Sequence, residues 1–121
     1  MRALAVALGA SVALVAMAAC GGGVSQPAGS IKVSMSDFKF DPAAISTPSG
    51  KVVFYLVNSG TVSHDLVIRD GSGNRVATSE LVSAGDSIVF TVSNLAAGGY
   101  TIFCDQDAHE SLGMKGTLTA T

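Results

Sequence analysis

Four side chains in this 121-residue sequence carry donor atoms that suit a soft metal ion. Cys104, His109 and Met114 lie in one run with four residues between successive members, and His64 lies well upstream. Copper that alternates between Cu(I) and Cu(II) is bound by one thiolate and two imidazoles in a trigonal set, with a weak axial thioether. The sequence therefore predicts one copper ion bound by these four residues, in a site that needs little rearrangement when one electron is gained or lost.

Each of the four residues also has an ordinary interpretation when it is taken alone. A single histidine is usually a surface residue, and an inward cysteine is usually a small apolar part of the core. A domain that uses them only in this way would be a metal-free interaction module. Cys104 could also form a disulfide with Cys20 if the protein is exported. The joint spacing of the donors favours the metal site over these alternatives.

Short apolar runs separated by Gly, Pro, Asn, Asp and Ser follow residue 31, and they predict the strands that must position the donors. Residues 37–40 lead into Asp41-Pro42, and residues 75–82 fit either an edge strand or a single helical turn. The seven clearer strands are expected at 31–35, 44–47, 51–57, 64–69, 87–92, 100–104 and 116–121. Seven to eight short strands without a sizeable helix predict an all-β Greek-key β-sandwich. The period of two places Tyr100, Ile102 and Cys104 on one face.

Two stretches of the sequence resemble the cupredoxin family. They are FDPAAISTPSGKVVFYLVNSGTVSHDLVI, which contains His64, and GGYTIFCDQDAHESLGMKGTLTAT, which contains Cys104, His109 and Met114. The spacing of the second stretch is most similar to the ligand loops of rusticyanin and auracyanin. The resemblance implies a type 1 blue copper ion bound by these four residues and a role in single-electron transfer.

The resemblance also implies a role for the residues beside the ligands. Asp65 stands where many members of the family have Asn, and Asp107-Ala108 replaces a Pro-Gly pair that often precedes the second histidine. In the family, the backbone N–H after the first histidine donates to the thiolate, and the side chain connects the two ligand segments. We expect Asp65 to accept a hydrogen bond from backbone N–H groups near Asp105 and to lower the reduction potential.

A docking surface for redox partners is expected around His109, whose counterpart in the family has an edge at the surface. The apolar ring would consist of Ala108, Leu112 and Gly113. The same loop carries Asp105, Asp107 and Glu110, with only Lys115 nearby to oppose them. These acids would steer a basic partner toward the site.

The composition argues against most other classes of function. The sequence contains only two histidines, so a further catalytic copper site has no ligands, and we expect no enzyme activity and no small-molecule substrate. The seven Lys and Arg residues are scattered, which argues against nucleic-acid binding. The partners would be redox proteins such as cytochromes or an oxidase. The alternative is a copper-binding or copper-delivery lipoprotein without an electron-transfer role.

The first 30 residues predict export and attachment to a membrane. Arg2 is followed by an apolar run and then by Ala18-Ala19-Cys20, which is typical of a lipoprotein signal peptide over residues 1–19. An uncleaved transmembrane anchor is the alternative. Cys20 would be lipidated, and residues 20–30 would form a flexible tether with a span of roughly 17 Å. The cupredoxin domain would occupy residues 31–121 on the extracytoplasmic side of the cell envelope, in the periplasm or at the cell surface.

Overall fold

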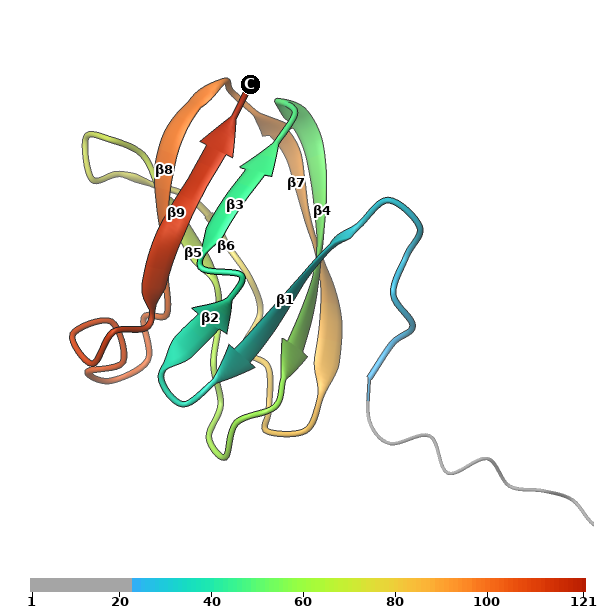
Figure 1. Cartoon of the computed structure of the whole chain (residues 1–121), viewed down its shortest axis with the longest axis vertical. Helices are drawn as coiled ribbons and strands as arrows, with labels where there is room; N and C mark the ends of the chain where they lie inside the picture. The colour runs from blue at the N-terminus through green and yellow to red at the C-terminus, as the bar shows by residue number, and fades with distance from the viewer. Residues whose placement is uncertain (1–22) are drawn as a thin grey trace, which may run out of the picture.

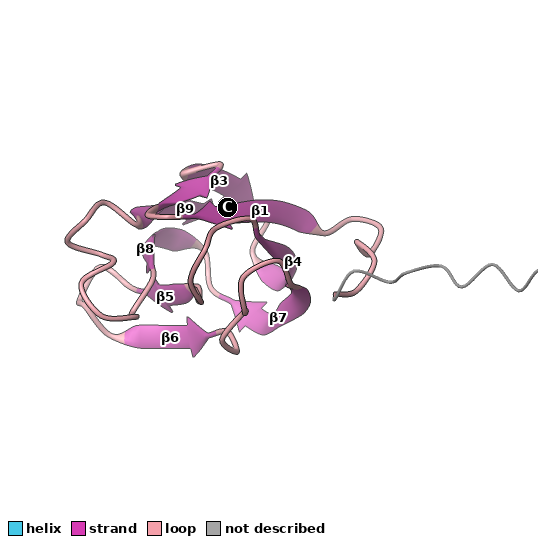
Figure 2. Cartoon of the chain, turned by 90° about the horizontal axis from the view of Figure 1, so that it is seen from below, coloured by secondary structure: helices cyan, strands magenta, loops and turns pink. Residues whose placement is uncertain are grey.

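Nine strands form two facing sheets in the computed structural model, which describes residues 23–121 (Figures 1 and 2). The expected signal segment 1–19 and Cys20 lie outside the described residues. The strands are β1 (Ile31–Ser36), β2 (Lys39–Asp41), β3 (Ala44–Thr47), β4 (Gly50–Asn58), β5 (Val67–Arg69), β6 (Arg75–Thr78), β7 (Ser87–Leu95), β8 (Gly98–Phe103) and β9 (Lys115–Ala120). The all-β sandwich is confirmed. Among the described residues, no helix is long and apolar enough to cross a membrane.

The first sheet has the strand order β2-β1-β4-β7. Strand β4 lies inside it, parallel to β1 and antiparallel to β7. Along β4 the side chains of Val52, Phe54 and Leu56 are buried while the intervening residues are only partly buried, as alternation across a strand requires. Phe54 stacks on Phe90 of β7 with ring centroids 5.8 Å apart.

The second sheet has the order β3-β9-β8-β5-β6. Strand β8 lies between β9 and β5 and is antiparallel to both. The last residues of β8, Ile102 and Phe103, are buried. Leu118 of β9, which pairs with Tyr100 of β8, is buried as well. Each fully buried side chain of this size contributes about 1.5–3 kcal/mol of transfer free energy. The strand that leads to Cys104 is therefore fixed by packing on one side and by two hydrogen-bonded neighbours.

Two of the expected segments differ from the structure. Residues 64–69 were expected to form one strand, but β5 begins only at Val67, and His64 lies in an isolated bridge to Val82. Residues 75–82 form an edge strand over Arg75–Thr78 rather than a helical turn. The count of nine exceeds the expected seven to eight because β2 and β6 are both short edge strands with few residues from which to recognise them.

Three connections meet at one end of the sandwich, the lower end in Figure 1, opposite the C-terminus. They are the β1–β2 turn, the β4–β5 segment and the β8–β9 loop.

The chain ahead of β1 contacts the start of β7. Val24 N–H donates to Ser87 Oγ at 3.1 Å, and Ser87 Oγ lies 3.3 Å from the Val24 carbonyl oxygen. Part of the stretch expected to be a free tether is thus hydrogen-bonded to the start of β7.

Candidate metal centre

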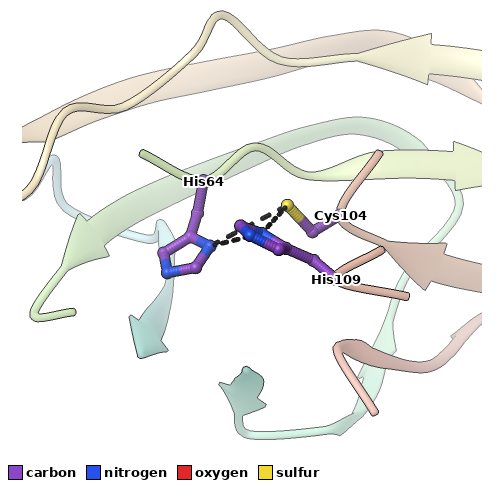
Figure 3. Close-up of side chains that lie close together, drawn as sticks. All are labelled: His64, Cys104 and His109. Carbon is purple, nitrogen blue, oxygen red and sulfur yellow. Dashed lines mark hydrogen bonds between the residues drawn. The ribbon is translucent and has the colours of Figure 1, made fainter. Parts of the chain in front are cut away.

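Three of the four expected ligands converge on one point (Figure 3). The Nδ1 atoms of His64 and His109 lie 3.2 Å apart, and Cys104 Sγ lies 3.4 Å from His109 Nδ1 and 3.9 Å from His64 Nδ1. Cys104 and His64 are fully buried, and His109 is 7% exposed. One thiol and two imidazole nitrogens thus face each other in a site closed to solvent.

Strand β8 sets the position of Cys104. Its last pair with β9 joins Phe103 and Lys115, and Cys104 follows directly. The Cys104 N–H donates to the Met114 carbonyl oxygen at 3.1 Å, and the Met114 N–H donates to the His109 carbonyl oxygen at 3.0 Å. Met114 is fully buried. The backbone therefore brings all three residues of the expected ligand loop together at the end of the β8–β9 ladder.

The β8–β9 loop closes through short-range backbone hydrogen bonds. His109 N–H donates to the Gln106 carbonyl, and Gly113 N–H donates to the Glu110 carbonyl, both at 3.0 Å. Asp107 has φ 42°, in the left-handed region that aspartate tolerates better than most residues. Gly113 has φ 111°, where a side chain would be strained. Asp107-Ala108 thus forms the turn where a Pro-Gly pair is common in the family.

His64 is positioned from the other sheet by the β4–β5 segment. Its N–H and carbonyl exchange hydrogen bonds with Val82 at 3.1 and 2.8 Å. The buried Asn58 side chain donates to the carbonyls of Val62 and Val82, both at 2.8 Å. Asn58 Oδ1 accepts from Gly60 N–H at 2.9 Å. The segment ahead of His64 is therefore fixed by one amide side chain at the end of β4.

Sequence reasoning missed the contribution of the β1–β2 turn. Asp37 Oδ1 lies 2.7 Å from His64 Nε2, and the Asp37 carboxylate also accepts from the backbone N–H and hydroxyl of Thr61. The Thr61 hydroxyl first, and the His64 ring second, lower the pKa of Asp37 to about 2. The next residue, Phe38, packs on His109 with ring centroids 4.7 Å apart and lies edge-on to His64 at 6.3 Å. Ser36 and Asp37 are residue types that favour turns, but no local pattern indicates that this turn lies against the segment that carries His64.

The surroundings of Cys104 oppose its ionisation in the metal-free protein. Burial raises the pKa of the thiol to about 11, while hydrogen bonds from the backbone N–H groups of Asp65 and Gln106 act in the opposite direction. These two donors would favour the thiolate once a cation replaces the proton. The donor from Asp65 is the one that the family resemblance implied.

Asp65 connects the two ligand segments. Its Oδ1 accepts from the backbone N–H of Asp105 at 2.9 Å, as expected, and Gln106 Nε2 lies 3.4 Å from its Oδ2. Burial, followed by the neighbouring Asp105 carboxylate, raises the pKa of Asp65 to about 6. The hydrogen bond from Asp65, followed by that from Arg75, lowers the pKa of Asp105 to about 2.

Arginines from β5 and β6 neutralise most of the acidic residues of the ligand loop. The guanidinium of Arg69 donates to both carboxylate oxygens of Glu110, and Arg75 donates to Asp105 at 2.6 Å. Both guanidinium groups also lie over the Phe103 ring, at 4.3 and 5.4 Å from its centroid. The expectation that only Lys115 opposes the acids was wrong, because β5 lies next to β8 in the sheet and β6 next to β5, and the two strands bring both arginines to the loop.

The residues expected to surround His109 are exposed. Leu112 is 60% exposed, and Ala108 and Gly113 are exposed as well. His109 itself is almost covered, and the tilted ring of Phe38 packs on it. An apolar surface therefore lies next to the histidine, while only a small part of the imidazole reaches solvent.

The donor set fits one copper ion. A carboxylate oxygen only accepts, so the Asp37 contact requires the proton of the neutral His64 ring to lie on Nε2. The lone pair of His64 then lies on Nδ1, the atom that faces Cys104 and His109. One thiol and two imidazoles are the soft and intermediate donors that copper prefers. Cys104 is a free cysteine among residues 23–121, and Cys20, its partner in the disulfide alternative, lies outside the described residues.

Comparison with known proteins agrees with this chemistry. Residues 4–120 match the family described as the cupredoxin-like domain. The chain belongs to the cupredoxin-like family. This cupredoxin is 44% identical over 55 residues to the azurin of Pseudomonas putida, a match that covers 43% of the chain and 42% of that azurin. The matched segment therefore spans about two fifths of the length of this curated relative.

Solved cupredoxin structures share the fold of this one. Auracyanin B superposes with a TM-score of 0.70 at 25% identity, covering 81% of this chain and 92% of that one. Auracyanin A of Chloroflexus aurantiacus superposes with a TM-score of 0.68 at 20% identity, covering 83% of this chain and all (100%) of that one. The first likeness agrees with the ligand-loop resemblance seen in the sequence, and the second shows the fold alone.

Proposed function

We propose that this cupredoxin binds one type 1 copper ion through His64, Cys104, His109 and Met114 and carries single electrons between redox proteins. The observation that carries the proposal is the convergence of one buried thiol and two buried imidazoles. The similarity to the azurins supports it. When bound, the copper ion would supply a one-electron couple.

The chain's own residues would keep this site rigid and dry. Backbone hydrogen bonds connect Cys104, His109 and Met114, and Val82 fixes His64 from the other side. Strands and short-range turns therefore orient the donors before any metal arrives. The buried Met114 side chain would supply a thioether as a fourth, weaker ligand. A closed set of donors favours electron transfer over copper delivery, which needs ligands that exchange readily.

Addition of Cu(II) to the purified domain tests this proposal. We expect an intense visible absorption band from the thiolate-to-copper transition at one copper per chain. Cys104→Ser should abolish the band because serine lacks the soft thiolate, while the far-ultraviolet spectrum of the β-sandwich stays unchanged. Met114→Leu should retain the band and raise the reduction potential, because an apolar side chain in place of the thioether disfavours Cu(II). A wild-type domain that binds Cu(II) without the band would refute the proposal.

The same protein is proposed to be anchored to the extracytoplasmic side of the cell envelope through a lipid on Cys20. The support is the sequence Ala18-Ala19-Cys20 after an apolar run. We expect the full-length protein, expressed in a bacterium, to partition into the detergent phase of a two-phase extraction. Cys20→Ala should move it to the aqueous phase or block its maturation. Partition of the wild-type protein into the aqueous phase would contradict the anchor.

A further inference from the structure

The side chain of Asp37 is hydrogen-bonded to the β4–β5 segment rather than extended into solvent. Its Oδ1 contacts His64 Nε2 at 2.7 Å, and both of its oxygens accept from Thr61 N–H, at 3.2 and 3.0 Å. The Thr61 hydroxyl donates to Oδ2. Asp37 therefore makes three kinds of contact across a gap of more than 20 residues in sequence, all within the segment that carries His64.

The chain leaves space for this contact. A Cβ atom at residue 60 would lie 2.4 Å from Asp37 Oδ1 and 3.0 Å from His64 Nε2, so any residue but glycine there would displace the pair. Asn58 fixes Gly60 in place by accepting its N–H at 2.9 Å. The Asp37–His64 pair thus occupies a space that the backbone of Gly60 keeps open.

The hydrogen bond of the Asp37–His64 pair can run in only one direction, from the imidazole to the carboxylate. A carboxylate accepts and cannot donate, so it selects the ring form of His64 that is protonated at Nε2. An aspartate carries a negative charge at neutral pH by its ordinary ionisation. A carboxylate on the far nitrogen of a metal-binding imidazole fixes the orientation of the ring and increases the basicity of the nitrogen that binds the metal.

We propose that Asp37 is a positioning residue of the copper centre, which fixes the ring form of His64 and strengthens its Nδ1 as a donor to Cu(II) more than to Cu(I). The inference rests on the proposed copper function. Because the added negative charge favours the more highly charged ion, the contact lowers the reduction potential. A role limited to closing the β1–β2 turn would affect stability and leave the potential unchanged.

Three variants separate these roles. Asp37→Asn removes the charge at nearly constant shape. Asp41→Asn removes the same charge from an exposed position on the next strand and serves as the matched control. Thr61→Val removes one hydrogen bond to Asp37 but leaves the contact with His64, so it reports the effect of loosening the turn alone.

We expect Asp37→Asn to weaken binding of Cu(II) by 10- to 100-fold, as loss of such partners does at other metal sites, and to weaken Cu(I) binding less. A tenfold change in the ratio of the two affinities corresponds to a rise of 59 mV in potential. Asp41→Asn and Thr61→Val should stay close to the wild-type potential. Equal potentials in Asp37→Asn and Asp41→Asn would overturn the inference.

A second measurement uses the metal-free protein. Nitrogen-15 chemical shifts of the His64 ring should show Nε2 protonated and Nδ1 unprotonated in the wild type, and a larger Nδ1-protonated fraction in Asp37→Ala, which removes the acceptor of the Nε2 proton. An unchanged ring form would also overturn the inference. If wild-type protein with Cu(II) lacks the thiolate band, the copper function fails on its own, and the ring form still reports whether Asp37 positions His64.

Discussion

The Cys104 sulfur lies in surroundings that favour the neutral thiol until a cation is present. Burial raises its pKa to about 11, and the backbone N–H groups of Asp65 and Gln106 only partly offset that effect. Copper binding must therefore release a proton, so apparent copper affinity should decrease as the pH is lowered. The two N–H donors then serve the thiolate, because hydrogen bonds to an anion are stronger than those to a neutral acceptor.

Asp65 should make the stability of the metal-free protein depend on pH. The pKa of the Asp65 carboxyl is about 6 in the folded protein and 3.8 ordinarily, so the folded protein binds this proton more tightly than the unfolded chain does. The tighter proton binding stabilises the folded protein fully below about pH 4, and this stabilisation is lost as the pH rises through 6. Asp65→Asn should remove this loss, which is at most about 3 kcal/mol for a shift of this size and smaller where solvent screens the charge.

Urea denaturation of metal-free wild type and Asp65→Asn at pH 4 and pH 7 measures this effect. The difference between the two proteins cancels the contributions of the ionisable groups that both retain and that Asp65 does not contact. The variant should be relatively more stable at pH 7 than at pH 4. A difference that is the same at both pH values would show that Asp65 is not the titrating group.

The residues of the site differ in how far the sequence could predict them. Cys104, His109 and Met114 are close in sequence, so their donor types and spacing were visible together. Asp37 reaches His64 only because the turn between β1 and β2 lies against the β4–β5 segment, a contact between distant parts of the chain. The sequence also predicts no element for residues 37–40, which only lead into Asp41-Pro42. Local patterns therefore predicted the ligands but not the residue that orients one of them.

Strands β5 and β6 contribute the charges that compensate the ligand loop. Arg69 pairs with Glu110, and Arg75 pairs with Asp105, while both lie over Phe103, which precedes the thiol. The sequence did not predict the Arg69–Glu110 pair because it does not show that β5 lies next to β8, and it did not predict the Arg75–Asp105 pair because 75–82 could not be assigned to a strand. Partly exposed pairs of this kind contribute little to stability, about 0.2–1 kcal/mol each. Their larger effect is on the electrostatic potential around the ligand loop, which acts on an approaching partner.

Long-range steering by the loop should therefore be weak in the wild type. We expect the rate at which a cationic cobalt(III) phenanthroline complex oxidises the reduced protein to vary little with ionic strength. Arg69→Met keeps an apolar stem against Phe103 but leaves the Glu110 charge uncompensated. This variant should react faster at low salt, and its rate should fall as salt screens the charge.

Lys51→Met is the matched control for that experiment, because it removes one positive charge at the start of β4, at the end of the strand away from the loop (Figure 1). Stopped-flow rates at several salt concentrations compare the three proteins. If Arg69→Met shows the same salt dependence as Lys51→Met, the Arg69–Glu110 pair has no part in controlling the charge of the docking surface.

The whole sandwich should be stabilised by its metal without depending on it. The core contains fully buried side chains from both sheets, such as Phe54, Leu118 and Met35, so the metal-free domain should fold. An ion that binds only the folded state raises the free energy of unfolding by its binding free energy, about 2.7 kcal/mol at 100 times the dissociation constant. Calorimetry should show a higher melting midpoint with copper than without it. Equal midpoints would contradict copper binding by the folded state.

The contact between Val24 and Ser87 shortens the chain that would connect the domain to a lipid on Cys20. A lipid on Cys20 would be separated from Val24 by the three glycines at 21–23, rather than by the whole stretch to residue 30. The same scaling as for the tether gives roughly 10 Å for three residues. A linker this short would keep the domain in a layer next to the bilayer. Its electron donors and acceptors would then have to present their own redox groups within that layer, which selects membrane-bound partners over freely diffusing ones.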